Sequence, residues 1–424
     1  MPMTLAEKIV AKASGLASVR PGDIVTCKVD LAMIHDSGGP RRVGPILERL
    51  GTGLWDPDRV VLITDHYVPA TSDETRHIAE VTRLFAARHG LRNFHDQLGI
   101  CHVVLPEKGH LKPGMFCVGG DSHSPTGGAF GAYMFGIGAT EMAGVLATGE
   151  IWLRVPETIV IEWRGAFRRG VCAKDAMLFL CGRMGMGGGR YQAVEYCGEA
   201  VAGLSMQERM TLSNMTAELG GQTGLVAPDT KTADYIRKAG CEPGDISIWR
   251  TDADADVAER HVFDAGELEP QVAAPHSPAN AKPVTLCKDV PIDIAYVGAC
   301  TGAKLDDMRM AARILRGHET APSVKLLLAP ASRHDMDAAQ EEGVLQTLLD
   351  AGAELLPTSC GMCAGYGGAL QENSVCLSST ARNFKGRMGP ASAEVWLASP
   401  YTVAASAIAG HIADPRPMLE ANAP

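Results

Sequence analysis

The stretch DIAYVGACTGAKLDD, residues 293–307, joins an apolar strand, a cysteine and a helical pattern in one short segment. It places Cys300 just after the strand and before apolar residues at helical spacing. A second stretch, AELLPTSCGMCAGYGG at residues 353–368, repeats the arrangement with Cys360 and Cys363. In open α/β sheets, ligands bind beyond the carboxyl ends of the strands. The two turns therefore predict an α/β sheet with three cysteines at its ligand-binding edge.

The cysteine spacing alone leaves several kinds of site open. A single CxxC pair is compatible with half of a zinc site or with a redox dithiol. The sequence has neither a second CxxC nor an HxxxH partner, which argues against a closed zinc site, and a dithiol gives Cys300 no role. Three thiolates can instead hold three corners of an iron-sulfur cube. Such a cube leaves one iron open to act as a Lewis acid on a substrate oxygen.

Strand and helix patterns alternate along the rest of the chain, as in α/β proteins with mostly parallel sheets. Before residue 165, strands are predicted at VVLIT, HVVLP, MFCVGG and TIVIEW, and helices over residues 74–89 and 140–150. After residue 287, strands are predicted at IDIAYV, VKLLLAP, AELLP and SVCLSS, and single helices at LDDMRMAARIL and DAAQEEGVLQTLLDAG. Because Cys376 lies inside SVCLSS, we expect it to be a core residue and not a fourth ligand.

Composition divides the chain into three predicted domains, residues 1–165, 166–286 and 287–424. The best boundary candidate is the proline- and alanine-rich stretch LEPQVAAPHSPANAKP at residues 268–283, which predicts an ordered surface connection. The glycine-rich MGMGGGR at residues 184–190 lacks the lysine of a phosphate-binding loop and predicts a flexible turn.

Charge and hydropathy restrict the class of protein. The net charge of -10 and pI near 5.7 argue against nucleic acid as a ligand, because phosphate binding needs a basic face. No apolar run approaches the roughly twenty residues of a membrane span, and the N-terminus carries no signal-peptide pattern. The remaining cysteines are scattered through apolar segments, as expected of reduced thiols. We therefore expect a cytoplasmic protein without a membrane or nucleic-acid partner.

Both cysteine segments resemble those of the aconitase and isopropylmalate dehydratase superfamily. Further blocks occur in the family's order: VDLAMIHD, ITDHYVPA, GGDSHSPTGGAFGAYMFGIGATE, AVEYCG, TLSNMTAELGGQTGLVAPD, TARNFKGRMG and EVWLASPYTVAASAIAG. The resemblance covers essentially the whole chain and is greatest to the separate large subunits of the isopropylmalate isomerase and homoaconitase type. It implies three α/β/α domains around a central 4Fe-4S cluster. Cys300, Cys360 and Cys363 would bind this cluster and leave one iron without a protein cysteine ligand.

The resemblance also implies acid-base residues. Asp65 and His66 follow the strand VVLIT, and a neighbouring carboxylate can orient an imidazole and raise its pKa. A buried histidine with a satisfied hydrogen bond is the alternative, but the Asp-His pair matches the family's. His123 lies in a glycine-rich turn that brings the backbone close to a ligand, and Glu141 is its expected partner. Asp121 and Ser122 are expected to hold that turn together.

Substrate-binding residues are implied by two further blocks. Asn214 and Glu218 are four residues apart, so on one helix they would share a face. A solvated face is the alternative, but the family pattern favours a site role, with Glu218 near the open iron. Arg382 and Arg387 offer forked cations of the kind that dicarboxylates need, although either could form a surface salt bridge. We expect at least one to bind a substrate carboxylate or to orient the cluster loop.

The reaction implied by the family is the dehydration of a small hydroxy di- or tricarboxylate. 3-Isopropylmalate is the default substrate, and homoaconitase, aconitase and alkylmalate dehydratase activities are alternatives. The single-chain aconitases carry an additional swivelling domain, so we expect a separate small subunit that forms a heterodimer or heterotetramer with this chain. Some relatives bind RNA after cluster loss, but the acidic charge argues against that function here.

Three residues depart from the family's usual pattern. Gly38 replaces a hydroxyl-bearing residue, and Gly302 and Ala381 replace asparagines beside the cysteine segments. Side chains next to a metal site orient its ligands. We expect these changes to leave a pocket with fewer hydrogen bonds, which makes a malate with another substituent, such as dimethylmalate or methylmalate, the alternative to the default isopropylmalate.

Overall fold

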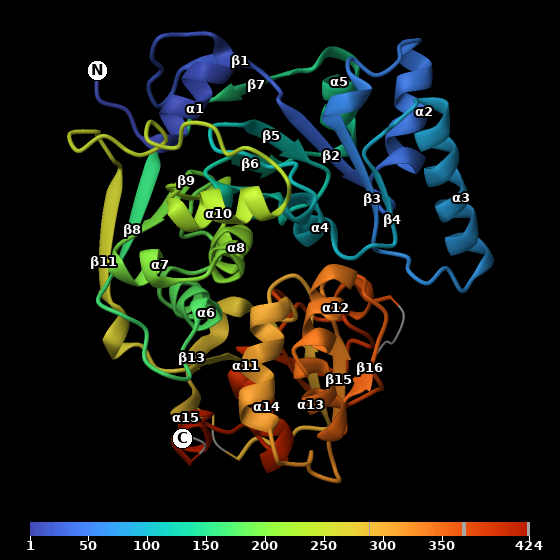
Figure 1. Cartoon of the computed structure of the whole chain (residues 1–424), viewed down its shortest axis with the longest axis vertical. Helices are drawn as coiled ribbons and strands as arrows, with labels where there is room; N and C mark the ends of the chain where they lie inside the picture. Colours follow the sequence, from blue (N-terminus) through green and yellow to red (C-terminus); the bar gives the residue numbers. More distant parts are fainter. Residues whose placement is uncertain (288, 367–369, 422–424) are drawn as a thin grey trace.

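Four sheets organise the chain in the computed structural model, which describes residues 1–287, 289–366 and 370–421. Three are large and mostly parallel, and the fourth is an antiparallel pair. In Figure 1 the large sheet formed by the C-terminal part of the chain, coloured yellow to red, occupies the lower half of the view with its helices, below the other two large sheets. The predicted α/β class with mostly parallel sheets is confirmed.

The first large sheet is entirely parallel, in the order β4-β3-β2-β5-β6. Its strands are β2 (Leu31–His35), β3 (Val60–Thr64), β4 (Phe94–Asp96), β5 (Phe116–Gly119) and β6 (Tyr133–Gly136). Every residue of β2 and β3 is buried, as expected for parallel strands covered on both faces. The antiparallel pair β1 (Ile24–Lys28) and β7 (Glu150–Arg154) forms a two-stranded sheet of its own.

A second parallel sheet follows, in the order β10-β9-β8-β11. Its strands are β8 (Thr158–Arg164), β9 (Ala193–Cys197), β10 (Thr223–Val226) and β11 (Glu259–Asp264). Two separate helices, α8 (Met206–Asn214) and α9 (Thr216–Leu219), lie between β9 and β10 in the chain, with Met215 at their junction. Asn214 and Glu218 therefore lie on different helices, contrary to the prediction that they share one.

The third sheet has the order β13-β12-β18-β17-β14-β15-β16. Its strands are β12 (Gln271–Ala273), β13 (Ala281–Pro283), β14 (Ile294–Gly298), β15 (Lys325–Ala329), β16 (Glu354–Leu355), β17 (Val375–Ser378) and β18 (Glu394–Ala398). Two of them come from the proline-rich stretch, and β12 is buried, so that stretch contributes to a sheet instead of only crossing the surface. Cys376 is fully buried in β17, as expected of a core residue.

Helices cover the sheets. Besides α8 and α9 they are α1 (Leu5–Ser14), α2 (Pro40–Leu50), α3 (Asp73–Arg88), α4 (Cys101–Glu107), α5 (Ala139–Thr148), α6 (Ala173–Met184), α7 (Glu199–Gly203), α10 (Thr230–Lys238), α11 (Leu305–Leu315), α12 (Arg333–Glu341), α13 (Val344–Asp350), α14 (Pro400–Ala409) and α15 (Arg416–Ala421). None of the helices in the described ranges is long and apolar enough to cross a membrane.

Two further local predictions were wrong. The run HVVLP, predicted as a strand, forms most of α4, because a short apolar run does not distinguish a buried helix from a strand. The helix predicted over residues 337–352 is divided into α12 and α13 at Gly343, whose φ of +72° is left-handed. Glycine adopts that conformation at little cost, and so allows the chain to turn there.

The first and third sheets meet at a junction that includes several backbone hydrogen bonds. Ile100 N–H donates to Ala331 O at 2.8 Å, and Arg333 N–H donates to Leu98 O at 2.9 Å. In the same way, Cys360 N–H donates to Asp65 O at 2.8 Å. These bonds fix the loops after β3 and β4 against the loops of the third sheet.

Two buried carboxyl groups share this junction. Ser332 Oγ–H donates to Glu107 Oε1 at 2.6 Å, and Gln207 Nε2–H donates to Asp335 Oδ1 at 2.8 Å. Burial, together with the neighbouring charge of Asp335, raises the pKa of Glu107 from its ordinary value of 4.5 to about 8. Burial also raises the pKa of Asp335 to about 6. The pair therefore retains a proton near neutral pH.

Replacing Glu107 with glutamine should flatten the pH dependence of the free energy of unfolding between about pH 5 and pH 8. In this range the folded wild type binds more protons than the unfolded chain, so its stability falls as the pH rises through the folded pKa of Glu107. Glutamine does not titrate. Urea denaturation of the metal-free protein at both pH values measures the slope. The exposed Glu74→Gln should keep the wild-type slope, and an unchanged slope in Glu107→Gln would contradict the prediction.

Candidate active site

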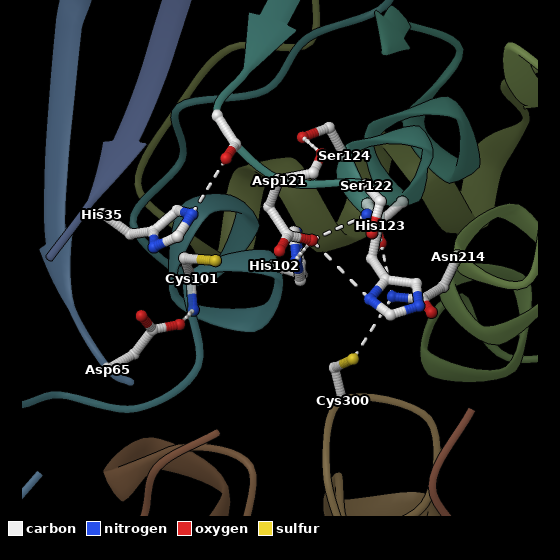
Figure 2. Close-up of polar contacts among 12 residues, drawn as sticks. His35, Asp65, Cys101, His102, Asp121, Ser122, His123, Ser124, Asn214 and Cys300 are labelled. Carbon is white, nitrogen blue, oxygen red and sulfur yellow. Dashed lines mark hydrogen bonds and ion pairs between the residues drawn. The ribbon is translucent and has the colours of Figure 1, made fainter. Parts of the chain in front are cut away.

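Polar side chains gather at the carboxyl ends of β2, β3 and β5, where a parallel sheet presents its ligand-binding edge. These ends carry, in order, His35 with Asp36, Asp65 with His66, and Asp121 with Ser122 and His123. Figure 2 shows several of these side chains directed toward one region, with Cys300 entering it from the third sheet. The strand ends thus bring together residues that are far apart in the sequence.

Asp65 and His66 form the first acid-imidazole pair. His66 Nδ1 lies 2.6 Å from Asp65 Oδ1, while Asp65 Oδ2 accepts a hydrogen bond from Cys101 N–H at 2.7 Å, at the start of α4. Burial by itself would lower the pKa of His66, but the charge of Asp65 and their hydrogen bond outweigh it and raise the pKa to about 10. His66 is therefore an imidazolium at neutral pH.

His35 and Asp36 surround that pair, and the sequence did not single them out. Asp36 accepts hydrogen bonds from the backbone N–H groups of His66 and Tyr67, each at 3.1 Å. The ring of His35 stacks on the ring of His66, with 4.3 Å between centroids and 17° between planes. His35 Nε2 also lies 3.0 Å from Gly120 O. The signal available in the sequence was their position after an apolar strand, the same position that drew attention to Asp65 and His66.

His123 and Glu218 form a second pair. His123 Nε2 lies 2.9 Å from Glu218 Oε1, and the same oxygen accepts a hydrogen bond from Arg382 Nε at 2.5 Å. Glu218 is fully buried, yet His123 and Arg382 outweigh the effect of burial and lower its pKa to about 2. The predicted partnership of His123 with Glu141 is wrong. Glu141 instead accepts a hydrogen bond from Gly138 N–H at 3.1 Å, at the start of α5.

Asp121 and Ser122 do more than hold their turn. Asp121 Oδ1 accepts a hydrogen bond from His123 N–H at 2.7 Å, as expected for a turn residue, but it also lies 2.8 Å from His102 Nε2 (Figure 2). Ser122 Oγ accepts a hydrogen bond from Arg382 Nη1 at 2.8 Å. His102 was missed because it lay in the run that was predicted as a strand. A third carboxylate-imidazole pair therefore borders the site.

Cys300, Cys360 and Cys363 lie on the facing loops of the third sheet. Cys300 is in the turn between β14 and α11, and Cys360 and Cys363 flank and occupy the 3₁₀ turn Gly361–Ala364. Cys300 and Cys363 are buried and Cys360 is half-buried. Because Cys360 N–H donates to Asp65 O, the cysteine loop directly adjoins the loop that carries His66.

Polar donors surround the sulfurs. Asn214 Nδ2–H donates to Cys300 Sγ at 3.3 Å, and Arg387 Nη2 lies 4.0 Å from Cys363 Sγ. Burial raises the pKa of Cys300 to about 12, so without a metal this thiol keeps its proton, whereas a bound metal displaces it. Two fully buried oxygens nearby, Asn214 Oδ1 and Glu218 Oε2, have no hydrogen-bond partner within the described residues. The site thus combines sulfur ligands, hydrogen bonds to sulfur and unfilled acceptors.

The donor set suits a cluster better than a single ion. The side chains that converge closely enough to share one ion, within the described residues, belong to three groups of His, Asp and Glu, and the cysteines are in none of them. A cluster binds each cysteine to a different iron, so its sulfur ligands need not meet at one point.

The three residues that depart from the family pattern lie in different surroundings. A side chain at Gly302 would collide with Ser379, whose hydroxyl fills that space, so Gly302 leaves no gap for a substrate. Ala381 is 1% exposed and packs in a hydrophobic core. A Cβ at Gly38 would lie 3.3 Å from Gly120 O and 3.5 Å from the ring of His35. Gly38 therefore borders a site histidine.

Alanine at Gly302 should lower the free energy of unfolding by about 1–3 kcal/mol, because the added Cβ overlaps Ser379 in a buried turn. Adding Ser379→Gly to that variant should recover part of the loss. Gly53→Ala is the control, since a Cβ there meets nothing within 4 Å. Chemical denaturation of the metal-free proteins measures the differences. Equal stability of Gly302→Ala and wild type would show that the overlap is relieved at no cost.

Comparison with known proteins identifies the family. The family described as "Aconitase family (aconitate hydratase)" matches residues 7–410. The 3-isopropylmalate dehydratase large subunit 1 of Methanopyrus kandleri is 45% identical, over 99% of this chain and 100% of that one. From Methanothermobacter thermautotrophicus, the probable 3-isopropylmalate dehydratase large subunit is 45% identical, over 98% of this chain and 99% of its own. The probable methanogen homoaconitase large subunit of that organism is 41% identical, over 98% of both chains. With matches that extend over nearly its whole length, the chain belongs to the aconitase family.

Proposed function

We propose that this chain is the cluster-binding subunit of a hydro-lyase that dehydrates a hydroxy di- or tricarboxylate, with 3-isopropylmalate as the first candidate substrate. Membership of the aconitase family and the dehydratase names of its relatives support the reaction class. The observation that carries the site assignment is the hydrogen bond from Cys360 N–H to Asp65 O, because it joins the cysteine loop to the loop of the proposed proton donor, His66.

Cys300, Cys360 and Cys363 would hold a 4Fe-4S cluster, and Asn214 and Arg387 would donate to its sulfur ligands. When bound, such a cluster supplies an iron without a cysteine ligand, which acts as a Lewis acid on the substrate hydroxyl. This arrangement would use the donors already present around the sulfurs.

His66 would act as the general acid. Its ring is held by Asp65, and its backbone N–H by the carboxylate of Asp36. The ring is protonated at neutral pH and can give its proton to the departing hydroxyl oxygen. After the transfer, the neutral ring would still be oriented by Asp65. In the reverse direction, in which water adds to the substrate, the neutral imidazole of His66 would accept a proton from that water.

Arg382 and Glu218 would bind the substrate's polar groups. Arg382 uses Nε and Nη1 for Glu218 and Ser122, and its side chain is 15% exposed, so the guanidinium edge can reach a carboxylate. The unpartnered Glu218 Oε2 can accept a hydrogen bond from a substrate hydroxyl. His123 would set the position of that carboxylate through its bond to Oε1.

A partner subunit would complete the site. The relatives are named large subunits, which supports a small-subunit partner for this chain as well. That partner would supply the base that removes the carbon-bound proton, and the pair would form a heterodimer or heterotetramer. Alkylmalates remain candidate substrates beside isopropylmalate and homocitrate, because Gly38 removes a side chain next to His35.

The test is anaerobic co-expression with the small-subunit reading frame of the source genome, followed by parallel assays on isopropylmalate, homocitrate, citrate, dimethylmalate and other alkyl malates. We expect turnover only from the two-subunit enzyme, and the highest kcat/KM identifies the substrate. Full activity of the isolated chain would contradict the split-enzyme proposal. A large preference for isopropylmalate would show that Gly38 does not redirect specificity.

A further inference from the structure

Lys174, in the first turn of α6, has an environment that the proposed reaction does not explain. Its side chain is among the largest that are fully buried, although a lysine is almost never buried without a charged partner. α6 belongs to the middle part of the chain, yet the ammonium group reaches the third sheet. The position therefore connects two parts of the fold.

The ammonium group of Lys174 bridges the two segments that carry the cysteine and arginine residues. Its Nζ donates to Thr301 Oγ1 at 3.2 Å, to Ser379 O at 3.1 Å and to Thr380 O at 2.5 Å. Thr301 directly follows Cys300, and Thr380 precedes Arg382 by two residues. One cation thus fixes the Cys300 turn against the segment that leads to Arg382.

All three acceptors are neutral, so none of the hydrogen-bond partners of Lys174 balances its charge. It forms no ion pair with any carboxylate in the described part of the chain, whereas the equally buried Lys304 pairs with Asp307 at 2.6 Å. Burial lowers the pKa of Lys174 to about 8, and the groups that oppose this shift are Glu218, Cys300 and Cys363. The negative groups that act on this ammonium are therefore Glu218, which has the largest effect, and the cysteine site, and all of them belong to the proposed active site.

We propose that Lys174 is a positioning residue that serves as the buried counter-charge of the iron-sulfur cluster and fixes the turn bearing Cys300. This inference rests on the proposed function, because it requires a cluster at the three cysteines. Three thiolates and their cluster carry net negative charge in a region of low dielectric, where an adjacent cation stabilises the reduced cluster. Lys174 supplies that cation without withdrawing any carboxylate from the acid-base residues.

The test compares wild type with Lys174→Met, which removes the charge and the donors, and Lys174→Gln, which keeps donors but no charge. The proteins are co-expressed with the small subunit, and two properties of the cluster are measured: its midpoint reduction potential by electron paramagnetic resonance titration, and its rate of iron loss to a chelator. We expect both variants to have lower potentials. Lys174→Met should also lose iron about 10–100-fold faster, the usual cost of removing a group that supports a metal's ligands.

A matched control is Lys304→Met/Asp307→Asn, which removes a buried lysine near the same turn together with its charge partner, so that net charge is unchanged. Its potential should remain near that of wild type. A wild-type potential and iron-loss rate in folded Lys174→Met would overturn the inference. Failure of both metal-free Lys174 variants to fold would also overturn it, because the lysine would then serve the fold. A wild-type protein without a cluster would instead refute the proposed function.

Discussion

Serine in place of Cys300, Cys360 or Cys363 is expected to remove the broad visible absorption of the cluster and to lower kcat/KM by on the order of 10³-fold or more. Each serine hydroxyl is a poorer iron ligand than a thiolate, and the polarisation of the substrate hydroxyl depends on the metal. The measurement is the visible spectrum and iron content of anaerobically purified protein, followed by assay of the two-subunit enzyme.

The control for these variants is Cys376→Ala. Cys376 is a fully buried thiol of β17, in the same sheet, and should be dispensable for iron binding. A full cluster in Cys300→Ser would contradict the ligand assignment. A cluster with four protein ligands would leave the spectrum unchanged on addition of a hydroxy acid, and this outcome would indicate electron transfer instead of dehydration.

Glutamine in place of His66 should lower kcat by about 10²–10⁴-fold while the cluster absorption remains. Glutamine keeps a polar side chain beside Asp65 but cannot deliver a proton to a departing hydroxyl. Asp65→Asn should have a smaller effect at low pH and a larger one at high pH. Asp65 no longer offsets the effect of burial in this variant, so the pKa of His66 is lower than in wild type. His66 therefore loses its proton, and with it the ability to act as an acid, at a lower pH than in wild type.

The test is to measure kcat of wild type, His66→Gln and Asp65→Asn from about pH 6 to about pH 10. This range extends from the ordinary pKa of histidine, 6.5, to the raised pKa of His66, about 10. His77→Gln, which changes an exposed histidine of α3, should match wild type throughout. Near-normal kcat in a cluster-containing His66→Gln protein would assign the proton donor to another residue, with His102 and His123 as the next candidates.

The strand-end residues could be predicted from the sequence because their signal is local. An apolar run followed by glycine or by small polar residues marks the carboxyl end of a buried strand, and Cys300, Asp65 and His123 all follow such a run. Apolar residues at helical spacing likewise located α11, and the apolar run around Cys376 predicted its burial. What each side chain does in the reaction is still a prediction.

The pairing of side chains could not be predicted in the same way, because it depends on distance in space. The family resemblance implied Glu141 as the partner of His123, whereas the partner in the structure is Glu218, which is 95 residues away in the sequence. His102 pairs with Asp121 through α4, a helix that the apolar pattern did not distinguish from a strand. Gly302 was expected to change the pocket, but the space beside it is filled by Ser379, which no one-dimensional pattern reveals.

The backbone junction between the first and third sheets has a consequence for how this protein can diverge. Cys360 N–H and Asp65 O, like Ile100 N–H and Ala331 O, are groups that nearly every amino acid possesses. The spacing between the cysteine loop and the acid-imidazole loop is therefore inherited largely from the main chain. Mutations can exchange the side chains that face the substrate and leave this spacing intact. Such a scaffold allows new hydroxy acids to be accepted gradually during evolution, while the chemistry performed on them is preserved.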